Sequence, residues 1–410
     1  MKELMSPRGP LAHALCLLAL TTAPASAQLA VRGDTVHTMT GAPIADGVVL
    51  IGADGKVDRV GPASEVAIPD GYRTLRARVV TPGLIDAHTV VGLAGSLNQP
   101  HDQMQLERSS PVQPELRAVD AYDARETLVG WLRQHGVTTL HTGHGPGTLI
   151  SGQTMIVKSR GDEVEDAIME PIAMIATTLG DSGLAEGDKA PGTRAKAIAI
   201  LRGELLKARD YLAKQNGPED KRPARDLRLE ALGQVLRKER PLLVTANRAT
   251  DIGNALRVAR EFDIPVVLDG ACEAYLVTDT IKAAGVPVIL HPTMQRAFGE
   301  TENLSMETAA RLRAAGIPFA LQSGYESYVP KTRVVLFEAA LAAARGLTPE
   351  QALAAITIDA ARILRVDDRV GSLEPGKDGD LALFDGDPFE YTSHVTAVVI
   401  EGQVVSESPQ

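Results

Sequence analysis

The chain has 410 residues, of which 44% are hydrophobic, and it carries a formal net charge of -10 at pH 7. A chain of this length and apolar content can bury a large core, so we expect a globular protein with one large domain and a small second one. The acidic balance argues against nucleic-acid or anionic-membrane partners, because those surfaces select for clustered Lys and Arg. A small polar or peptide-like ligand fits this composition better.

The N-terminal segment has the form of an export signal. An apolar stretch at residues 11–20 follows two basic residues, and residues 25–27 read Ala-Ser-Ala, the small-x-small pattern of a signal-peptidase site. We predict that residues 1–27 are removed and that a periplasmic or secreted protein begins at Gln28. No later segment approaches the roughly 20 apolar residues that a membrane span requires, so no span is predicted.

The two ends of the remaining chain share strand character. Residues 29–80 contain short β-rich runs separated by turn-forming pieces, and residues 380–384 and 395–400 return to the same pattern. The simplest assembly joins both ends into one small discontinuous β-sandwich. We assign this domain to residues 28–80 plus 366–410.

Between these ends, residues 81–365 alternate apolar strands with amphipathic segments of helix length. The strand candidates are residues 84–87, 137–141, 154–157, 172–176, 242–246, 266–268, 288–290 and 319–322. A closed parallel barrel needs eight such strands. The sequence therefore predicts an α/β protein in which a TIM-like (β/α)8 barrel carries the small β-sandwich.

Two long motifs resemble the amidohydrolase superfamily. Residues 80–88 read VTPGLIDAH, which is similar to the first barrel strand of that superfamily, and residues 370–381 read VGSLEPGKDGDL, which is similar to its return to the sandwich. The resemblance covers about residues 29–405 and points to the imidazolonepropionase-like, metal-dependent hydrolases. It implies hydrolysis of carbon–nitrogen bonds, non-peptide or dipeptide-like, by water activated at one or two divalent metals.

This chain departs from the family at the positions that hold the metal. The first strand of the family ends in HxH, whereas here His88 is followed by Thr89 and Val90, and valine cannot bind a metal. Other expected ligand positions are occupied by Thr245, Asn247 and Gly324, and the position on the sixth strand is either Gly270 or Asp269.

Three residues, His88, Lys158 and Asp269, remain as possible ligands from the family's own positions. Lys158 is either an ordinary charged residue or a carbamylated ligand. A catalytic zinc site uses about three protein ligands plus water. We therefore expect no cofactor, unless a rebuilt site binds zinc or another divalent metal.

A rebuilt site has its candidates in the loop after the second strand. His141 and His144 lie there among several glycines, which allow the backbone to approach a ligand closely. The candidates for catalysis are His88, His141, His144 and Lys158. The candidates for metal binding are His88, His141 and His144. The other interpretation is that His141 and His144 cap backbone groups. Tyr325 and Glu326, after the eighth strand, are further catalytic candidates.

Two functional hypotheses follow from these residues. One is a hydrolase with a rebuilt site, and the other is a non-catalytic pseudoenzyme that serves as a partner subunit or small-molecule binding module. The second is favoured because the replacements fall at several strand ends while the scaffold motifs stay intact. We expect self-association or pairing with a metal-competent relative more than capture of a small polar ligand, because Val90, Gly270 and Gly324 cannot orient one.

Overall fold

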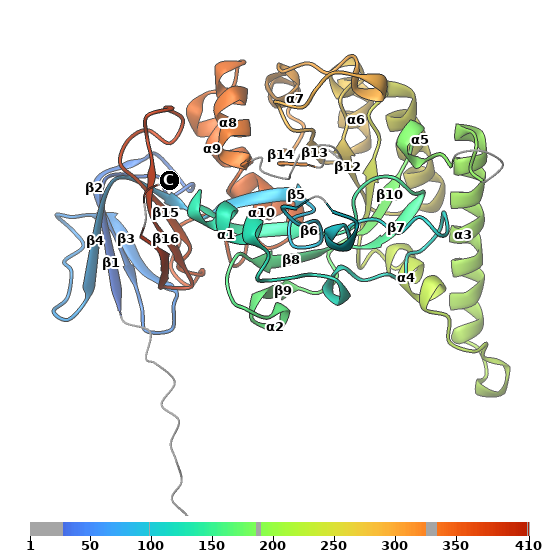
Figure 1. Ribbon diagram of the computed structural model, residues 1–410, viewed down its shortest axis with the longest axis horizontal. Helices are drawn as coiled ribbons and strands as arrows, with labels where there is room; N and C mark the ends of the chain where they lie inside the picture. The colour runs from blue at the N-terminus through green and yellow to red at the C-terminus, as the bar shows by residue number, and fades with distance from the viewer. Residues whose placement is uncertain (1–27, 98, 186–189, 325–333, 408, 410) are drawn as a thin grey trace, which may run out of the picture.

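The computed structural model describes residues 28–97, 99–185, 190–324, 334–407 and 409. The predicted signal segment 1–27 and the candidates Tyr325 and Glu326 lie outside these residues. A β-rich unit built from both chain ends lies beside a larger α/β unit (Figure 1). Within the described residues, no helix has the length and apolar character to cross a membrane.

The β-rich unit is one seven-stranded sheet in the order β17-β16-β15-β4-β1-β2-β3. Its strands are β1 (Leu29–Val36), β2 (Ile44–Ile51), β3 (Val57–Pro62), β4 (Arg73–Pro82), β15 (Leu381–Phe384), β16 (Val395–Ile400) and β17 (Gln403–Ser406). β15 joins the two ends of the chain, because it pairs antiparallel with β4 and sets Leu383 opposite Val80. The described strands thus form a single sheet, and the expected two-sheet sandwich is not confirmed.

Apolar side chains from both ends of the chain share one core in this sheet. Leu29 and Val80 cluster with Leu381 and Val399. On the other face, Phe384 belongs to the core of the larger unit. Because each end contributes only part of this shared core, neither end has a complete core alone. Burial of apolar surface stabilises a fold by roughly 25 cal/mol per Å².

Arg73 ties the two ends of the described chain together. Its backbone N–H donates to the carbonyl of Gln28 over 3.0 Å. Its guanidinium donates to the carboxylate of Glu407 over 2.6 Å.

The larger unit contains two sheets. Their strands are β5 (Leu84–Thr89), β6 (Val137–Thr142), β7 (Ile150–Gln153), β8 (Met155–Lys158), β9 (Ile168–Glu170), β10 (Ile175–Thr178), β11 (Leu242–Thr245), β12 (Val266–Gly270), β13 (Val288–Leu290) and β14 (Phe319–Leu321). One sheet has the order β14-β13-β12-β11-β10-β7 and the other β5-β6-β8-β9. All eight predicted strand segments overlap observed strands, although β10 begins three residues later than expected.

The prediction of a closed parallel barrel is wrong in two respects. β7 and β8 are separated only by Thr154, and they run antiparallel to β10 and β6 respectively. On the other side, the bridge between Thr89 and Gly324 is isolated, so no ladder joins β5 to β14 in the part of the chain described. The third predicted strand was placed correctly but in the wrong direction, because an apolar run carries no information about strand direction.

The space between the strands is nonetheless filled as in a barrel. Ile85, Leu243, Val267, Ile289 and Ala320, each from a different strand, form one buried cluster. Bulky apolar residues that point inward from successive strands are what fills a TIM-type barrel. This layer lies beneath the carboxyl ends of the parallel strands. We call the region around these carboxyl ends the mouth.

Helices follow the strands and cover their outer side (Figure 1). They are α1 (Thr127–Gln134), α2 (Val164–Ala167), α3 (Arg194–Gln215), α4 (Leu227–Leu236), α5 (Ala249–Phe262), α6 (Thr278–Ala284), α7 (Thr308–Ala315), α8 (Val335–Ala344), α9 (Pro349–Ala355) and α10 (Ile358–Leu364). α5 buries Ile252 and Leu256 on one face, as an amphipathic helix does. α6 and α7 end at Gly285 and Gly316, whose φ angles of 65° and 71° are the left-handed conformation that glycine adopts at helix ends.

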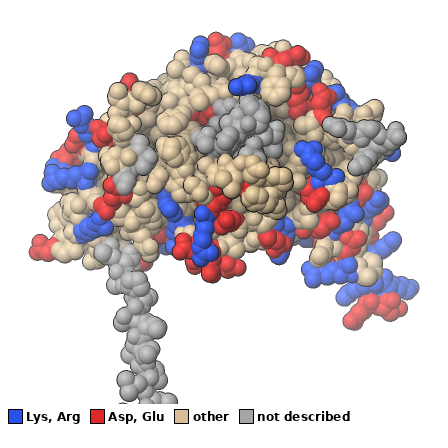
Figure 2. Space-filling view, in the orientation of Figure 1, with Lys and Arg blue, Asp and Glu red and all other residues tan. Residues whose placement is uncertain are grey.

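The surface carries both signs of charge. In the view of Figure 2, basic and acidic side chains are interspersed, including on the end of the molecule where the last part of α3 and the connection to α4 project. Neither sign forms a continuous field on this face.

Candidate functional site

A small cavity of about 60 Å³ lies at the mouth. Its walls include His88 from β5, Thr245 from β11, Asp269 from β12 and Gln322 just after β14, together with Asn247. The carboxyl ends of barrel strands are where barrel enzymes place their sites. None of the described residues that line this cavity is a lysine or arginine.

His88 and Asp269 form the central pair of the cavity. The Nδ1–H of His88 donates to Asp269 Oδ1 over 2.9 Å, and the two side chains are 6% and 4% exposed. Burial lowers the pKa of His88, but the charge and hydrogen bond of Asp269 outweigh this and raise that pKa above its ordinary value. Burial raises the pKa of Asp269, and His88 with the other donors outweighs this, so its pKa is lowered. The pair therefore favours an imidazolium beside a carboxylate.

Asp269 is held by two further donors. Gln322 Nε2 donates to Oδ1 over 2.8 Å, and Thr245 Oγ1 donates to Oδ2 over 2.6 Å. Both carboxylate oxygens thus accept hydrogen bonds within the protein. Sequence reasoning identified Thr245 only as a replacement for a ligand and did not connect it to Asp269. Polar residues at the ends of β11, β12 and β14 were the signal that could have suggested this network.

Two buried polar atoms near the pair have no partner among the described residues. They are His88 Nε2 and Asp86 Oδ2. Burial raises the pKa of Asp86 to about 6, despite its hydrogen bonds from Ser323. Buried polar groups in folded proteins are nearly always paired, so each of these atoms needs an explanation.

His141 lies close to His88 but is engaged elsewhere. The two ring centroids are 5.4 Å apart. His141 Nδ1 donates to the carbonyl of Ala87 and Nε2 accepts from the hydroxyl of Thr154, each over 2.7 Å. Burial, followed by the charge of His88, lowers its pKa to about 3. His141 is therefore a neutral residue with both nitrogens used, which matches the interpretation that this histidine caps neighbouring groups.

His144 is buried but does not line the cavity. Its ring lies against Gly152 of β7, where an added Cβ would stand 2.5 Å from Nε2. Burial lowers its pKa to about 4. The structure thus brings His88 and His141 together and sets His144 apart from the cavity.

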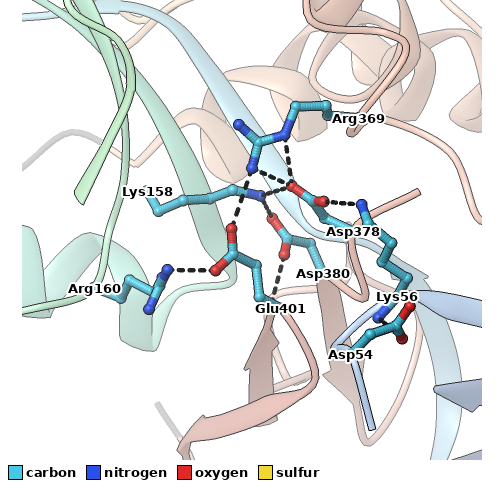
Figure 3. Close-up of polar contacts among 8 residues, drawn as sticks. All are labelled: Asp54, Lys56, Lys158, Arg160, Arg369, Asp378, Asp380 and Glu401. Carbon is cyan, nitrogen blue, oxygen red and sulfur yellow. Dashed lines mark hydrogen bonds and ion pairs between the residues drawn. The ribbon is translucent and has the colours of Figure 1, made fainter. Parts of the chain in front are cut away.

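Lys158 lies away from the histidines of the mouth. It ends β8 and pairs in register with Thr139, in the amino-terminal half of β6, because β8 runs antiparallel. Its ammonium group contacts the carboxylates of Asp380 and Asp378, as Figure 3 shows. The expectation that Lys158 joins His88 in a rebuilt site does not agree with this placement.

Lys158 belongs instead to a charged cluster between the barrel and the terminal sheet (Figure 3). The members of this charged cluster are Lys56, Lys158, Arg160, Arg369, Asp378, Asp380 and Glu401. Arg369 donates to Asp378 over 2.8 Å, and Lys56 contacts the other oxygen of that carboxylate over 3.0 Å. Every cation of the cluster faces a carboxylate, so the cluster is a structural junction.

Cys272 is no nucleophile in this arrangement. It is buried and its thiol donates to Asn247 Oδ1 over 3.1 Å. Burial raises the pKa of the thiol, which keeps it protonated.

A divalent metal does not fit the described donors. Both nitrogens of His141 and both oxygens of Asp269 are hydrogen-bonded, which leaves His88 Nε2 as the free imidazole nitrogen of the histidine pair. In the described part of the chain, no three His, Cys, Asp or Glu residues are grouped to hold an ion. One nitrogen is too few for a catalytic or a structural zinc site.

Comparisons with known proteins agree with this fold. A family model described as "Amidohydrolase family" matches residues 276–406. The chain is 28% identical to the imidazolonepropionase of Paracoccus denitrificans over 393 residues, which cover 83% of this chain and 88% of that protein. The imidazolonepropionase of Maricaulis maris is 28% identical over 384 residues, which cover 86% and 91%. An amidohydrolase from Thermotoga maritima superposes with a TM-score of 0.86 at 29% identity and covers 92% of this chain and 100% of that one.

The fold is therefore the α/β fold, of the TIM-barrel type, that amidohydrolase structures have. These similarities support a relationship of the chain to the amidohydrolase superfamily. Members of this superfamily usually bind a divalent metal. The described residues of this chain contain no group of side chains that could hold one.

Proposed function

We propose that this chain is a small-molecule binding module of the amidohydrolase superfamily whose mouth does not carry out metal-activated hydrolysis. The observation that carries the proposal is the network in which Thr245, Gln322 and His88 all donate to Asp269. A carboxylate whose two oxygens already accept three hydrogen bonds from the protein has most of its lone pairs turned to those donors instead of to a metal.

The cavity also offers more polar groups than the sequence pattern suggested. Val90, Gly270 and Gly324 do line it, but so do Asn247 and Gln295. A few fixed polar groups in a concave site are what orients a small molecule. These groups support ligand capture over pairing with a metal-competent relative, and pairing stays a prediction that a co-purification experiment can address.

A second candidate is hydrolysis of carbon–nitrogen bonds with His88 as general base. It is favoured by the hydrogen bond from His88 to Asp269, because a carboxylate that orients an imidazole is a recurrent arrangement for proton transfer. The nitrogen that would accept the proton is Nε2, which has no partner in the described residues. It can do so only in the neutral form of His88, which the raised pKa disfavours.

One set of measurements distinguishes these functions. Purified full-length protein is analysed for metals and then assayed on N-acyl amino acids and dipeptides, with and without added zinc. We expect substoichiometric metal and no zinc-dependent turnover, together with a thermal shift on screening small polar compounds. Metal at one ion per chain that is lost in His88→Gln, with turnover that requires it, would refute the proposal. Metal-independent turnover that is lost in the same variant would support the second candidate.

A further inference from the structure

The unpartnered nitrogen of His88 indicates what kind of group the cavity takes. His88 is 4% exposed and lines the cavity, its Nδ1 faces Asp269, and its Nε2 on the other side of the ring is buried without a partner. An unsatisfied buried polar atom is unfavourable, so a ligand that pairs with this atom is favoured over one that leaves it unpaired.

The charge balance of the cavity decides whether this nitrogen donates or accepts. The groups that face His88 are Asp269 from β12, Asp86 from its own strand and His141 from β6. His141 has both nitrogens hydrogen-bonded, and among the residues that the structure describes no lysine or arginine lines the cavity. A neutral His88 would leave the Asp269 carboxylate buried without a compensating cation, which is strongly unfavourable. His88 is therefore the cation of the pair, and its Nε2 carries a hydrogen to donate.

A second donor lies in the same cavity. The Oδ1 atom of Asn247 accepts from Cys272 Sγ over 3.1 Å, so its Nδ2 group is the part of this amide available to a ligand. Gly270 leaves room for this amide, because an added Cβ would stand 2.6 Å from Asn247 Oδ1. Two donors, one of them charged, suit a group with two acceptor oxygens.

We propose that the mouth binds a carboxylate group, with His88 Nε2–H and Asn247 Nδ2–H donating to its oxygens. This inference rests on the proposed binding function and deepens it. The imidazolium takes the place of the metal cation as the positive charge of the site. The cavity of about 60 Å³ accommodates the carboxylate end of a ligand, and the remainder of a larger ligand extends outward.

The test uses full-length protein with ¹⁵N-labelled histidine and three small probes. Sodium acetate, acetamide and methylammonium chloride are titrated at constant ionic strength while the imidazole nitrogens are followed by NMR. The His88 signals are assigned by their loss in His88→Gln. We expect acetate to shift them saturably, acetamide to require at least about tenfold more, which corresponds to about 1.4 kcal/mol, and methylammonium to leave them unchanged.

A matched control and opposite outcomes complete the design. His394 pairs with Asp385 over 3.1 Å at the surface, so His394→Gln removes a comparable pair far from the cavity and keeps the acetate response. No saturable response to acetate, or an equal response to acetamide or methylammonium, overturns the inference. If acetamide alone shifts the His88 signals, the binding function survives without the carboxylate. If zinc binds stoichiometrically through His88, the binding function fails as well.

Discussion

The ammonium group of Lys158 contacts the carboxylate of Asp380, a residue 222 positions further along the chain. The two side chains are 2% and 4% exposed, so this ion pair is buried between the barrel and the terminal sheet. Removing one partner of a buried pair leaves the other charge without compensation, and that costs more than the pair itself contributes.

The Lys158→Met variant should lose about 3–5 kcal/mol of free energy of unfolding, because Asp380 then lies buried without the ammonium group that compensates its charge. Urea denaturation followed by circular dichroism measures this loss. The control is Lys207→Met, which removes an exposed pair with Glu204 and should change stability by less than about 0.5 kcal/mol. Equal effects of the two substitutions would mean that the charged cluster does not hold the units together.

Asp378 should make the protein less stable at low pH. Burial raises its pKa, but the charge of Lys158, the hydrogen bond from Lys56 and the charge of Arg369 outweigh this and lower it. A carboxyl whose folded pKa is lower stabilises the fold above its unfolded pKa of about 3.9, and this stabilisation is lost as the pH falls through the folded value. The free energy of unfolding, measured from pH 5 to pH 2, should therefore decrease less steeply in Asp378→Asn than in the unmodified protein. The exposed Asp120→Asn serves as a control and should keep the steeper dependence.

The carboxyl group of Asp86 should have the opposite effect on the pH dependence of stability. Its pKa is raised to about 6 by burial, so between about pH 4 and pH 6 the folded state binds more protons than the unfolded one. Its contribution to stability therefore decreases as the pH rises across this interval. The Asp86→Asn variant should show a flatter stability profile there by thermal unfolding, and an unchanged slope would show that this carboxyl titrates normally.

Restoring one ligand should not restore a metal site. Val90→His returns the second histidine of the HxH pattern, but the nitrogens of His141 stay bonded to Ala87 and Thr154. A zinc site needs about three ligands, so dialysed protein should contain no stoichiometric zinc by elemental analysis. Detection of one tightly held ion per chain in this single variant would show that a latent site exists.

Deleting the chain from Arg365 onward should give insoluble protein. The deletion removes β15, which pairs with β4, and it removes Leu381 and Val399 from the shared core. The edge of β4 and the apolar face of the sheet are then exposed, and both promote aggregation. The fraction of soluble protein on expression measures the effect, and a soluble truncated form of equal melting temperature would contradict a shared core.

Much of the fold could be predicted because apolar periodicity reports which segments are strands. The expected strand 288–290 has the same bounds as β13, and all eight strand candidates overlap observed strands. Apolar periodicity does not report the direction of a strand. The run that forms β8 is apolar whether it is parallel or antiparallel, so Lys158 at its end was assigned to the wrong end of the barrel.

The sequence predicted which residues lie at the mouth, but not which of their side chains form hydrogen bonds with one another. The sequence located His88 and Asp269 at strand ends that meet at the mouth, and the structure sets them 2.9 Å apart. It could not show that Thr245 and Gln322 turn toward the same carboxylate, because rotamers depend on neighbours that are distant in the chain. His144 was left open between two interpretations, and its place against Gly152 depends on packing that spacing does not encode.

The position of Arg73 has a consequence for the order of the chain itself. Because this one residue binds both Gln28 and Glu407, a short linker could join these two residues without disturbing β1 or β17. New termini could then be opened in the connection between α3 and α4, where residues 217–222 are largely exposed. Such a circular permutant should fold, because closely spaced termini and exposed connections are the conditions under which permutation is tolerated.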